Sequence, residues 1–424
     1  MKKFFQNIRP LLLLLLLNAI GMLLMYIKGV DTLEDMAILC SAMCLLSIAM
    51  YAIITLFSLG DSYLFIIISM LSTVGIIMQS RINQDDGMRQ MKLYLVGVAF
   101  FFIALFVYKC FHKHFEKFTF FYWGLSMALF AFTAVFGTVR NGAKNWIDLP
   151  GLPSIQPSEF IRILFVLSLA AIFTRARSRK KGKYIPYLER KKIKSTRLMF
   201  AAGIAFSNAL CLFLQREWGI ALLFFAIYIA FLYIYGENKL FFAANMVLVI
   251  FAAFIGVKFM SHIQVRISAW LDPFNDVDGK GYQIVRSLFA IGEGGFAGTG
   301  IGAGSPYLIP VVNSDFIFSA ICEEMGVLGG VAILMLYFLL VYRGFKISLS
   351  STNEFNKAVA MGLSVMLGIQ TFIIVGGVTK LIPLTGITLP FISFGGSSMI
   401  TTFIVMGMLQ AISSIKGEVT DEIE

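Results

Sequence analysis

Long apolar runs with short polar breaks between them fill most of the sequence. A transmembrane helix needs about 20 consecutive apolar residues. About twelve runs approach or exceed that length, or ten if neighbouring short runs merge. The predicted spans are 11–28, 36–59, 61–80, 91–109, 118–138, 158–174, 198–214, 219–235, 239–260, 315–342, 357–378 and 396–415. The pattern therefore predicts an all-α polytopic membrane protein.

The composition agrees with a chain that is solvated by lipid. Apolar residues make up 58% of the chain and charged residues 14%, whereas soluble domains average about 45–50% and about 25%. Mean hydropathy is +0.83. In a soluble protein, the formal net charge of +11 would raise the question of nucleic-acid binding. Here the basic residues lie in short gaps between apolar runs, where they set membrane orientation, so we predict no nucleic-acid partner.

The basic loops predict the side of the membrane on which each break lies. Segment 175–197 has eleven Lys and Arg residues against one Glu, and such clusters mark cytoplasmic loops. The N-terminal MKKFFQNIR, the loop YKCFHKHFEK and the pair Arg343 and Lys346 are separated from it by even numbers of spans. We therefore predict that both termini are cytoplasmic. Binding of 175–197 to anionic lipid head groups is a secondary interpretation.

This orientation places four polar segments on the outer side. They are 139–157, 215–218, 261–314 and 379–395. Together they contain most of the residues that apolar packing does not explain. Segment 261–314 forms a long loop between the ninth and tenth spans, and a long ordered loop is usually functional. We therefore expect the working site at the outer face.

Asp315 is the acidic residue that stands out at this face. It follows Asn313 and Ser314 and comes directly before a strongly apolar run. One interpretation is a helix N-cap, for which Asp is favoured. The other is a general base, because partial burial at the membrane boundary raises the pKa of a carboxylate toward working pH. The residues alone leave both interpretations open.

Other charged residues lie inside or between the predicted spans. Glu323 and Glu324 fall within the tenth span, where carboxylates are costly and face either a polar cavity or a cationic partner. Glu159 and Arg162 stand three residues apart at the start of a span, where they can pair. Glu217 lies in LQREWGIALL, which interrupts an apolar stretch. We expect these intramembrane charges to support a site or to form structural ion pairs.

Two segments are rich in glycine. The first, residues 292–304, contains seven glycines, which allow close approach of backbone to backbone or to a ligand. The second opens the last span with free backbone N–H groups, which is the geometry of an anion site. These N–H groups belong to Gly395, Gly396, Ser397 and Ser398. Lys380 adds a positive charge nearby.

Together, these segments predict an outward-facing polar site with carboxylates, cations and many glycines. Cations suit the negative charge of a transferred or leaving phosphate group. Broken helices with intramembrane carboxylates are also typical of transporters. The residue types therefore leave three functions open, namely transfer of a sugar, handling of a phosphorylated lipid, and transport.

Five stretches in a fixed order resemble the SEDS family (shape, elongation, division and sporulation), the RodA-, FtsW- and SpoVE-like proteins. They are NGAKNWIDL with QPSEFIR, LQREWGIALL, WLDPFNDVDGKGYQIVRSLFAIGEGGFAGTGIG, SDFIFSAICEEMG and IPLTGITLPFISFGGSSM. The resemblance implies a polymerase core at 139–424, with a cytoplasmic basic loop at 175–197 and an extracellular loop at 261–314. The N-terminal spans at 1–138 have no assigned role, and we expect a single membrane domain.

The resemblance implies a peptidoglycan glycosyltransferase that uses lipid II, the lipid-linked disaccharide precursor. Asp315 matches the family's essential acidic residue, whose implied role is general base toward the 4-hydroxyl of the acceptor GlcNAc. That oxygen attacks C1 of the donor MurNAc with inversion, and undecaprenyl pyrophosphate leaves. The diphosphate needs cations, with room for a divalent ion, Mg or Mn. The candidate substrate-binding residues are Arg266, Lys280, Arg286, Lys380, Ser314, Gly395, Gly396, Ser397 and Ser398.

The resemblance also implies a partner and a location. The family usually works with a class B penicillin-binding protein transpeptidase, in the bacterial cytoplasmic membrane, during cell elongation, division or sporulation. A lipid II flippase and a non-catalytic scaffold for a transpeptidase are the alternatives. The sequence departs from the family pattern at Arg162, where Lys is usual, and at Glu217, where the shorter Asp is usual. Arg286 and Glu293 stand where Gln and a small residue are common.

Overall fold

The computed structural model describes residues 8–27, 29, 33–140, 142–148, 154–174, 195–236 and 238–420. Twelve helices in this described part are long and apolar enough to cross a membrane. They are Ile8–Ile27, Ala37–Leu56, Ser62–Ile82, Gln84–Phe115, Thr119–Phe136, Pro157–Thr174, Thr196–Leu214, Trp218–Tyr235, Lys239–Phe259, Ile317–Ser350, Glu354–Val378 and Gly396–Ile415. The predicted number of spans is confirmed, and the chain is a multi-pass α-helical membrane protein.

Two helices are much longer than the predicted spans. Gln84–Phe115 extends the prediction of 91–109 at both ends, and Ile317–Ser350 continues past residue 342. Polar residues at these ends continue the helix beyond the apolar stretch from which the spans were predicted. The basic segment 175–197, which carried most of the predicted orientation, lies outside the described residues as far as residue 194.

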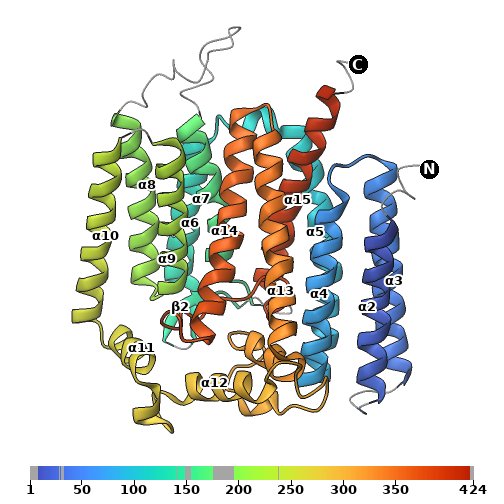
Figure 1. Cartoon of the computed structure of the whole chain (residues 1–424). Helices are drawn as coiled ribbons and strands as arrows, with labels where there is room; N and C mark the ends of the chain where they lie inside the picture. Colours follow the sequence, from blue (N-terminus) through green and yellow to red (C-terminus); the bar gives the residue numbers. More distant parts are fainter. Residues whose placement is uncertain are drawn as a thin grey trace. The chain divides into compact units, whose positions relative to one another are not determined.

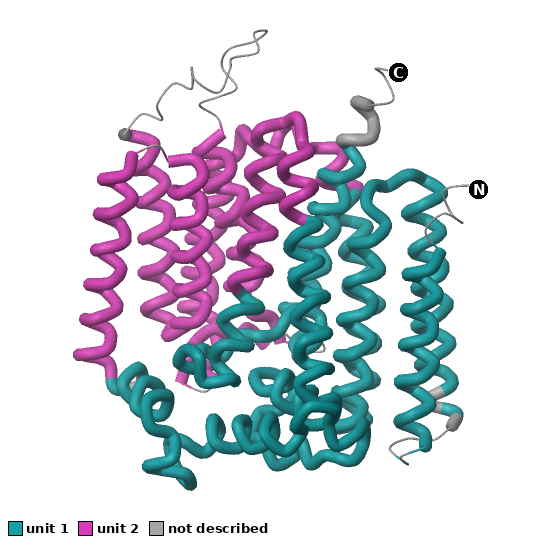
Figure 2. Tube along the Cα trace, viewed as in Figure 1, with its two compact units in different colours: residues 1–105, 261–343, 370–424 teal, residues 106–260, 344–369 magenta. Residues whose placement is uncertain are grey.

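The helices group into two compact units (Figure 2). Unit 1 comprises residues 1–105, 261–343 and 370–424, and unit 2 comprises residues 106–260 and 344–369. The predicted division of the chain into N-terminal spans at 1–138 and a polymerase core at 139–424 rests on the roles of these two parts and not on their compactness. It stays a prediction.

Unit 1 contains Asp315 and, in its described part, eleven helical elements. They are α2 (Ile8–Ile27), α3 (Leu33–Leu56), α4 (Ser62–Ile82), the first part of α5 (Gln84–Phe115), α11 (Ser261–Leu271), η2 (Pro273–Asp276), α12 (Tyr282–Gly294), η3 (Pro306–Leu308), most of α13 (Ile317–Ser350), the last part of α14 (Glu354–Val378) and α15 (Gly396–Thr420). Helix α4 is the most enclosed of them, because 83% of its span is buried. Its polar residues are therefore enclosed by protein and must find partners there.

Segment 261–314, expected as a long loop, contains two α-helices and two 3₁₀ turns. Helix α12 buries Ile284, Val285 and Ala290 on one face and exposes Phe289 on the other. With 13 residues it is too short to cross a membrane. Figure 1 shows α11 and α12 at the end of unit 1 where α4 ends and α13 begins, opposite to the end of α15.

Unit 2 contains the rest of the chain. Its elements are the end of α5, α6 (Thr119–Phe136), β1 (Thr138–Arg140), β2 (Ala143–Trp146), α7 (Pro157–Thr174), α8 (Ser195–Leu214), α9 (Trp218–Tyr235), α10 (Lys239–Phe259) and the start of α14. Strands β1 and β2 form an antiparallel hairpin that pairs Arg140 with Ala143. The span of α7 is 83% buried and that of α10 only 11%.

Candidate active site

Asp315 lies in the turn that precedes α13, two residues before the helix begins at Ile317. The turn is closed by bonds from the Ser314 and Asp315 N–H groups to the carbonyl oxygen of Val311, both at 3.2 Å. The Asp315 Oδ1 atom accepts a hydrogen bond of 2.9 Å from the Ser314 hydroxyl. This bond, rather than one from the first turn of α13, engages the carboxylate in the described structure, so the N-cap interpretation is not supported.

The surroundings of Asp315 shift its pKa in the direction that a general base needs. Burial raises the pKa of Asp315 above its ordinary value of 3.8, and this effect outweighs the Ser314 hydrogen bond and the charge of Arg266, which both lower it. Burial likewise lowers the pKa of the Arg266 guanidinium, and the charge of Asp315 raises it. The carboxylate is thus a stronger base than a solvated Asp, with a cation close enough to influence it.

Arg266 reaches this turn from α11 and is fixed by main-chain oxygens. Its Nη1 atom donates to the carbonyl oxygens of Leu384 and Thr385, at 3.1 and 3.0 Å. A Cβ atom built on Gly386 would lie 3.5 Å from Asp315 Oδ2 and 3.9 Å from Arg266 Nη2. Gly386 therefore borders the carboxylate and the guanidinium at once, and Oδ2 is the Asp315 oxygen left without a hydrogen bond among the described residues.

The Asp315 turn is held on the loop before α15. The Ser393 hydroxyl donates to the Ser314 carbonyl oxygen at 2.6 Å, and the Phe394 N–H donates to the Asn313 carbonyl oxygen at 2.8 Å. From α4, Gln79 Nε2 donates to the Asn313 oxygen at 2.7 Å and to the Ile392 oxygen at 3.3 Å. Three elements far apart in sequence thus set the position of the carboxylate.

The loops around Asp315 also contain unusual backbone conformations. Val311, Lys380 and Phe391 have φ values of 54°, 60° and 68°. Positive φ is uncommon outside glycine and is an outlier for a β-branched residue such as Val311. Each such conformation costs about 1–3 kcal/mol and persists where the surrounding structure enforces it, often at active sites. The concentration of three near one carboxylate is typical of a functional site.

Replacing Gly386 with alanine tests this geometry. The residue has φ of 72°, so Gly386→Ala is expected to cost about 1–2 kcal/mol in backbone strain. The added methyl group would also come into van der Waals contact with Oδ2 and occupy the space beside it. The family resemblance implies glycan polymerisation, and we expect its rate to fall by about tenfold or more, because small displacements of reacting groups are costly.

Gly142→Ala is the matched control for this change. Gly142 has φ of 80° and no atom within 4 Å of a built Cβ. It should show a similar fall in thermal midpoint with little change in polymerisation rate. Equal rates for the two variants would contradict a role for the space beside Asp315 Oδ2.

The other predicted substrate-binding residues are spread over the loops of unit 1. Helix α15 begins at Gly396 as predicted, and Ser398 Oγ lies 2.6 Å from Thr388 Oγ1. The main-chain oxygen of Lys380 accepts from Trp270 Nε1 at 3.0 Å, which fixes that loop on α11. Gly395 and Ser397 lie in the same short segment, and the anion site there stays a prediction.

The contacts of Lys280 and Arg286 in the described structure are with residues other than Asp315. Lys280 is exposed, and its main-chain N–H donates to Asp276 Oδ2 at 3.1 Å. The Arg286 guanidinium lies over the Tyr282 ring, 5.3 Å from its centroid. Neither contact tests a role in phosphate binding, which stays a prediction for both.

Glu323 and Glu324 anchor the glycine-rich segment on α13. Glu324 Oε1 pairs with Arg81 Nε at 2.9 Å, and its Oε2 accepts from the Gly302 N–H at 3.1 Å. Arg81 Nη2 also donates to the Gly304 oxygen at 2.9 Å. Glu323 Oε1 accepts from the Ser305 N–H. Both oxygens of Glu324 therefore bind protein groups, which favours its structural interpretation. Glu323 Oε2 is buried without a hydrogen-bond partner among the described residues, and the role of Glu323 stays a prediction.

Two glycines of this segment, Gly294 and Gly298, pack backbone against backbone. A Cβ atom on Gly298 would lie 2.6 Å from the Gly326 nitrogen. Gly326 itself has φ of 68° and ψ of −175° and kinks α13. Close packing therefore explains Gly294 and Gly298, whereas a Cβ atom built on Gly292 or Gly295 would meet no atom within 4 Å.

Sequence reasoning missed the corner between α4 and α5. Gln79 and Arg81 end α4, and Gln90 on α5 donates to the Ser393 oxygen at 3.4 Å. The signal was present, because alternation of the predicted spans places this corner on the same side as Asp315. Its polar residues were not counted among the outer segments because the break between the two spans is short.

Unit 2 contains a second buried polar cluster, built around Glu217. Its Oε1 atom accepts from Asn145 Nδ2 at 2.5 Å, Gln156 Nε2 at 2.6 Å and Ser158 Oγ at 3.1 Å. Burial raises the pKa of Glu217, although these three bonds lower it. The QPSE and LQREW motifs are therefore in contact, and Glu217 joins the β2 strand to the start of α7.

Glu159 and Arg162 form the predicted ion pair. Arg162 Nη2 lies 2.5 Å from Glu159 Oε2, and both side chains are almost fully buried. The substitution of Arg for the usual Lys therefore retains a pairing cation. Among the described residues, no group of three or more His, Cys, Asp and Glu side chains could hold a metal ion.

The chain matches the family model for FtsW, RodA and SpoVE proteins, described as "Cell cycle protein", over residues 49–417. The chain belongs to this family. It is 34% identical over 368 residues to peptidoglycan glycosyltransferase RodA of Mycobacterium tuberculosis, covering 83% of this chain and 78% of that protein. It is 36% identical over 282 residues to stage V sporulation protein E of Bacillus subtilis, covering 65% and 73%.

A solved structure agrees with the architecture. The structure is described as "Structural coordination of polymerization and crosslinking by a peptidoglycan synthase complex". It aligns with a TM-score of 0.69 at 24% identity, over 84% of this chain and 98% of that chain. The predicted family and the all-α multi-pass fold are therefore confirmed, and the names of the FtsW/RodA/SpoVE relatives agree with the predicted class of enzyme. The cytoplasmic position of the termini and the outer position of 261–314 stay predictions. The roles of individual residues stay predictions.

Proposed function

We propose that this protein polymerises lipid II into peptidoglycan glycan strands at the outer face of the bacterial cytoplasmic membrane. Membership of the FtsW/RodA/SpoVE family supports the reaction class. The observation that carries the assignment is the environment of Asp315. A carboxylate with a raised pKa, one oxygen held by Ser314 and the other beside Gly386, lies within electrostatic range of Arg266.

The two Asp315 oxygens have different roles in this proposal. The Ser314 bond orients the carboxylate through Oδ1, and Oδ2 takes the proton from the 4-hydroxyl of the acceptor GlcNAc. As that proton moves, the hydroxyl oxygen bonds to C1 of the donor MurNAc with inversion. The bond from C1 to the phosphate oxygen breaks, and undecaprenyl pyrophosphate leaves with the electron pair. Asp315 then returns its proton to solvent.

Cations near Asp315 stabilise the leaving diphosphate. Arg266 is the best placed, since it already lies beside the Asp315 carboxylate and is fixed by two carbonyl oxygens. Lys380 lies on the same loop as Leu384 and contributes a second positive charge. Preorganised charges of this kind stabilise the transition state without reorganisation during the reaction.

Asp315 is the residue here that would contribute to holding a divalent cation, Mg or Mn. Such ions prefer oxygen ligands and often keep several waters. Asp315 is a single carboxylate, so most ligands would come from the diphosphate and water. When bound, the ion would neutralise charge on the leaving group.

We further propose a class B penicillin-binding protein transpeptidase as the partner. The solved complex with a similar fold is described as coordinating polymerisation with crosslinking, and this supports such a partnership. Residues 139–424 would supply the polymerase core. Helices α4 and α5 would belong to the working site too, since Gln79 and Gln90 hold its loops.

Detergent-solubilised protein given lipid II tests this function. We expect glycan chains on a gel, either from the protein alone or after addition of a class B penicillin-binding protein blocked by a β-lactam. Detergent removes the membrane compartments, so a flippase has no measurable activity there. A scaffold would yield no glycan in either mixture, and that result would contradict the proposal.

A further inference from the structure

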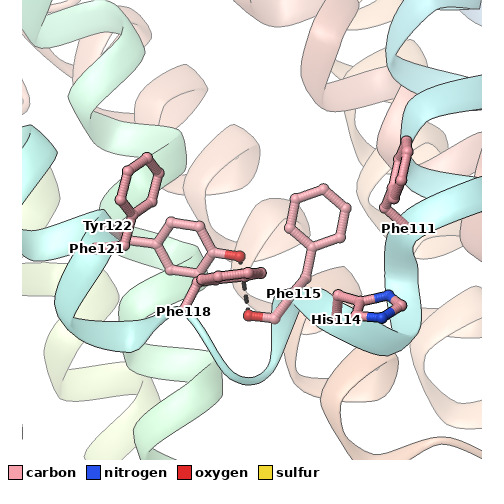
Figure 3. Close-up of a pocket in the computed structure, with 6 residues that line it drawn as sticks. All are labelled: Phe111, His114, Phe115, Phe118, Phe121 and Tyr122. Carbon is pink, nitrogen blue, oxygen red and sulfur yellow. Dashed lines mark hydrogen bonds between the residues drawn. The ribbon is translucent and has the colours of Figure 1, made fainter.

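The corner between α5 and α6 contains a pocket that the proposed reaction does not use. Its volume is about 490 Å³, and Figure 3 shows its side chains around the space between the end of one helix and the start of the next. The lining residues are Phe111, His114, Phe115, Phe118, Phe121 and Tyr122. All six belong to unit 2. The pocket is therefore apolar and formed by one continuous stretch of chain.

The pocket has a fixed inner wall and an exposed rim. Phe115 stacks on Tyr108 with ring centroids 5.2 Å apart, and the Tyr122 hydroxyl donates to the Phe115 oxygen at 2.8 Å. Phe111 and Phe121 are 56% and 62% exposed. At a corner joining two membrane-spanning helices, exposed aromatic rings are typical of contact with the lipid interface.

Exposed basic residues alternate with the pocket residues in the sequence. Lys113 and Lys117 are exposed and stand on either side of the pocket residue Phe115 in the sequence. The last turn of α5 is basic, with His112, Lys113 and His114. Glu116 is the one acidic residue between positions 109 and 122. The corner therefore complements an anion.

The start of α6 adds a second feature that favours an anion. Its N-cap residue, Phe118, makes no side-chain capping bond, and the first turn has no acidic residue. Backbone N–H groups there lack helical partners and carry the positive end of the helix dipole. The Thr119 hydroxyl is also without a hydrogen-bond partner in the described part of the chain, although Thr119 is only 5% exposed. An uncapped N-terminus of this kind accommodates phosphate.

We propose that the α5–α6 corner binds an anionic glycerophospholipid. Its phosphate would lie at the N-terminus of α6 beside Lys113 and Lys117, and an acyl chain would fill the aromatic pocket. A lipid joins a phosphate to a long apolar chain, as this corner requires. A zwitterionic lipid has the phosphate too, but its ammonium group would be repelled by the same lysines.

A photoreactive phosphatidylglycerol with a diazirine in its acyl chain tests the proposal. The full-length protein, in phosphatidylcholine nanodiscs, should be labelled within residues 108–122. Excess unlabelled phosphatidylglycerol should remove this labelling, and excess phosphatidylcholine should not. Lys113→Gln with Lys117→Gln should lower it by about thirtyfold, because each Lys near anionic lipid contributes about 1 kcal/mol.

Two control variants keep the test specific. Lys239→Gln removes an exposed lysine at the start of α10 and should leave the labelling unchanged. Phe118→Ala should reduce labelling, whereas Phe120→Ala should not, because Phe120 packs edge-on against Phe200 and does not line the pocket. Equal competition by phosphatidylcholine, or unchanged labelling of the double lysine variant, would overturn the proposal. So would labelling that falls elsewhere in the chain.

Discussion

Asp315→Asn is expected to abolish glycan polymerisation while leaving the protein at least as stable as the wild type. General-base catalysis contributes about 10²–10⁴-fold to a rate, and an amide cannot take the proton at Oδ2. The shape of the side chain is retained, and its oxygen can still accept the Ser314 hydrogen bond. The rate should be measured from lipid II on glycan gels, with residual activity compared to a no-enzyme control.

The stability of this variant follows from the sign of the pKa shift. Because the folded protein raises the pKa of Asp315 above 3.8, the neutral form is favoured by folding and the ionised form is disfavoured. The contribution of Asp315 to stability is thus complete below its ordinary pKa and is lost as pH rises through the raised value. Near neutral pH, the neutral Asn avoids this loss. A thermal midpoint for Asp315→Asn well below that of the wild type would contradict the burial argument.

The Asp315→Glu variant and the pH dependence of the polymerisation rate test whether Asp315 acts as a general base or only as a structural carboxylate. The wild-type rate should fall as pH falls through the raised pKa, because the base must be ionised to accept a proton. Asp315→Glu retains the acid but moves it by one methylene, and a displacement of about 1 Å can cost about 10²-fold. The variant should therefore be slow yet still show an acid limb. A rate independent of pH on the acid side would argue against Asp315 as the base.

The sequence was most informative where local pattern decides structure. Apolar run length predicted all twelve spans, because lipid requires about 20 apolar residues in each. The start of α15 at Gly396 also followed from the change in residue type there. Asp315 was identified as a candidate carboxylate by its position before an apolar run. Its interpretation as an N-cap was not supported, since capping depends on side-chain geometry that a single residue type does not specify.

The partners of the Asp315 turn could not be predicted in the same way. Gln79 and Asn313 are 234 residues apart, and Arg81 and Glu324 are 243 apart. No periodicity within a helix encodes such pairings. Run length also failed to indicate the helices within 261–314, because α11 and α12, with 11 and 13 residues, are too short to be recognised as spans. Tertiary packing, rather than propensity, decides both features.

Removing Glu324 is expected to destabilise the protein more than any other charge change in unit 1. The Arg81–Glu324 pair is enclosed, with side-chain exposures of 17% and 0%. Glu324→Ala would leave Arg81 without its carboxylate and the Gly302 N–H without its acceptor. Breaking a buried pair from one side costs about 3–5 kcal/mol. We expect a corresponding fall in the denaturation midpoint, measured in detergent with increasing denaturant.

A double variant and an exposed ion pair test whether the cost of removing Glu324 comes from leaving Arg81 buried without a partner or only from the lost attraction between the two charges. Arg81→Met with Glu324→Met removes both charges, and its cost should be less than the sum of the two single changes, because neither charge is then left buried alone. Arg140 and Asp148 are equally close, at 2.6 Å, but are 45% and 44% exposed. Asp148→Ala should therefore cost about 0–1 kcal/mol. If Glu324→Ala cost no more than that, the glycine-rich segment would be held on α13 by backbone packing at Gly298 and Gly326, and not by the ion pair.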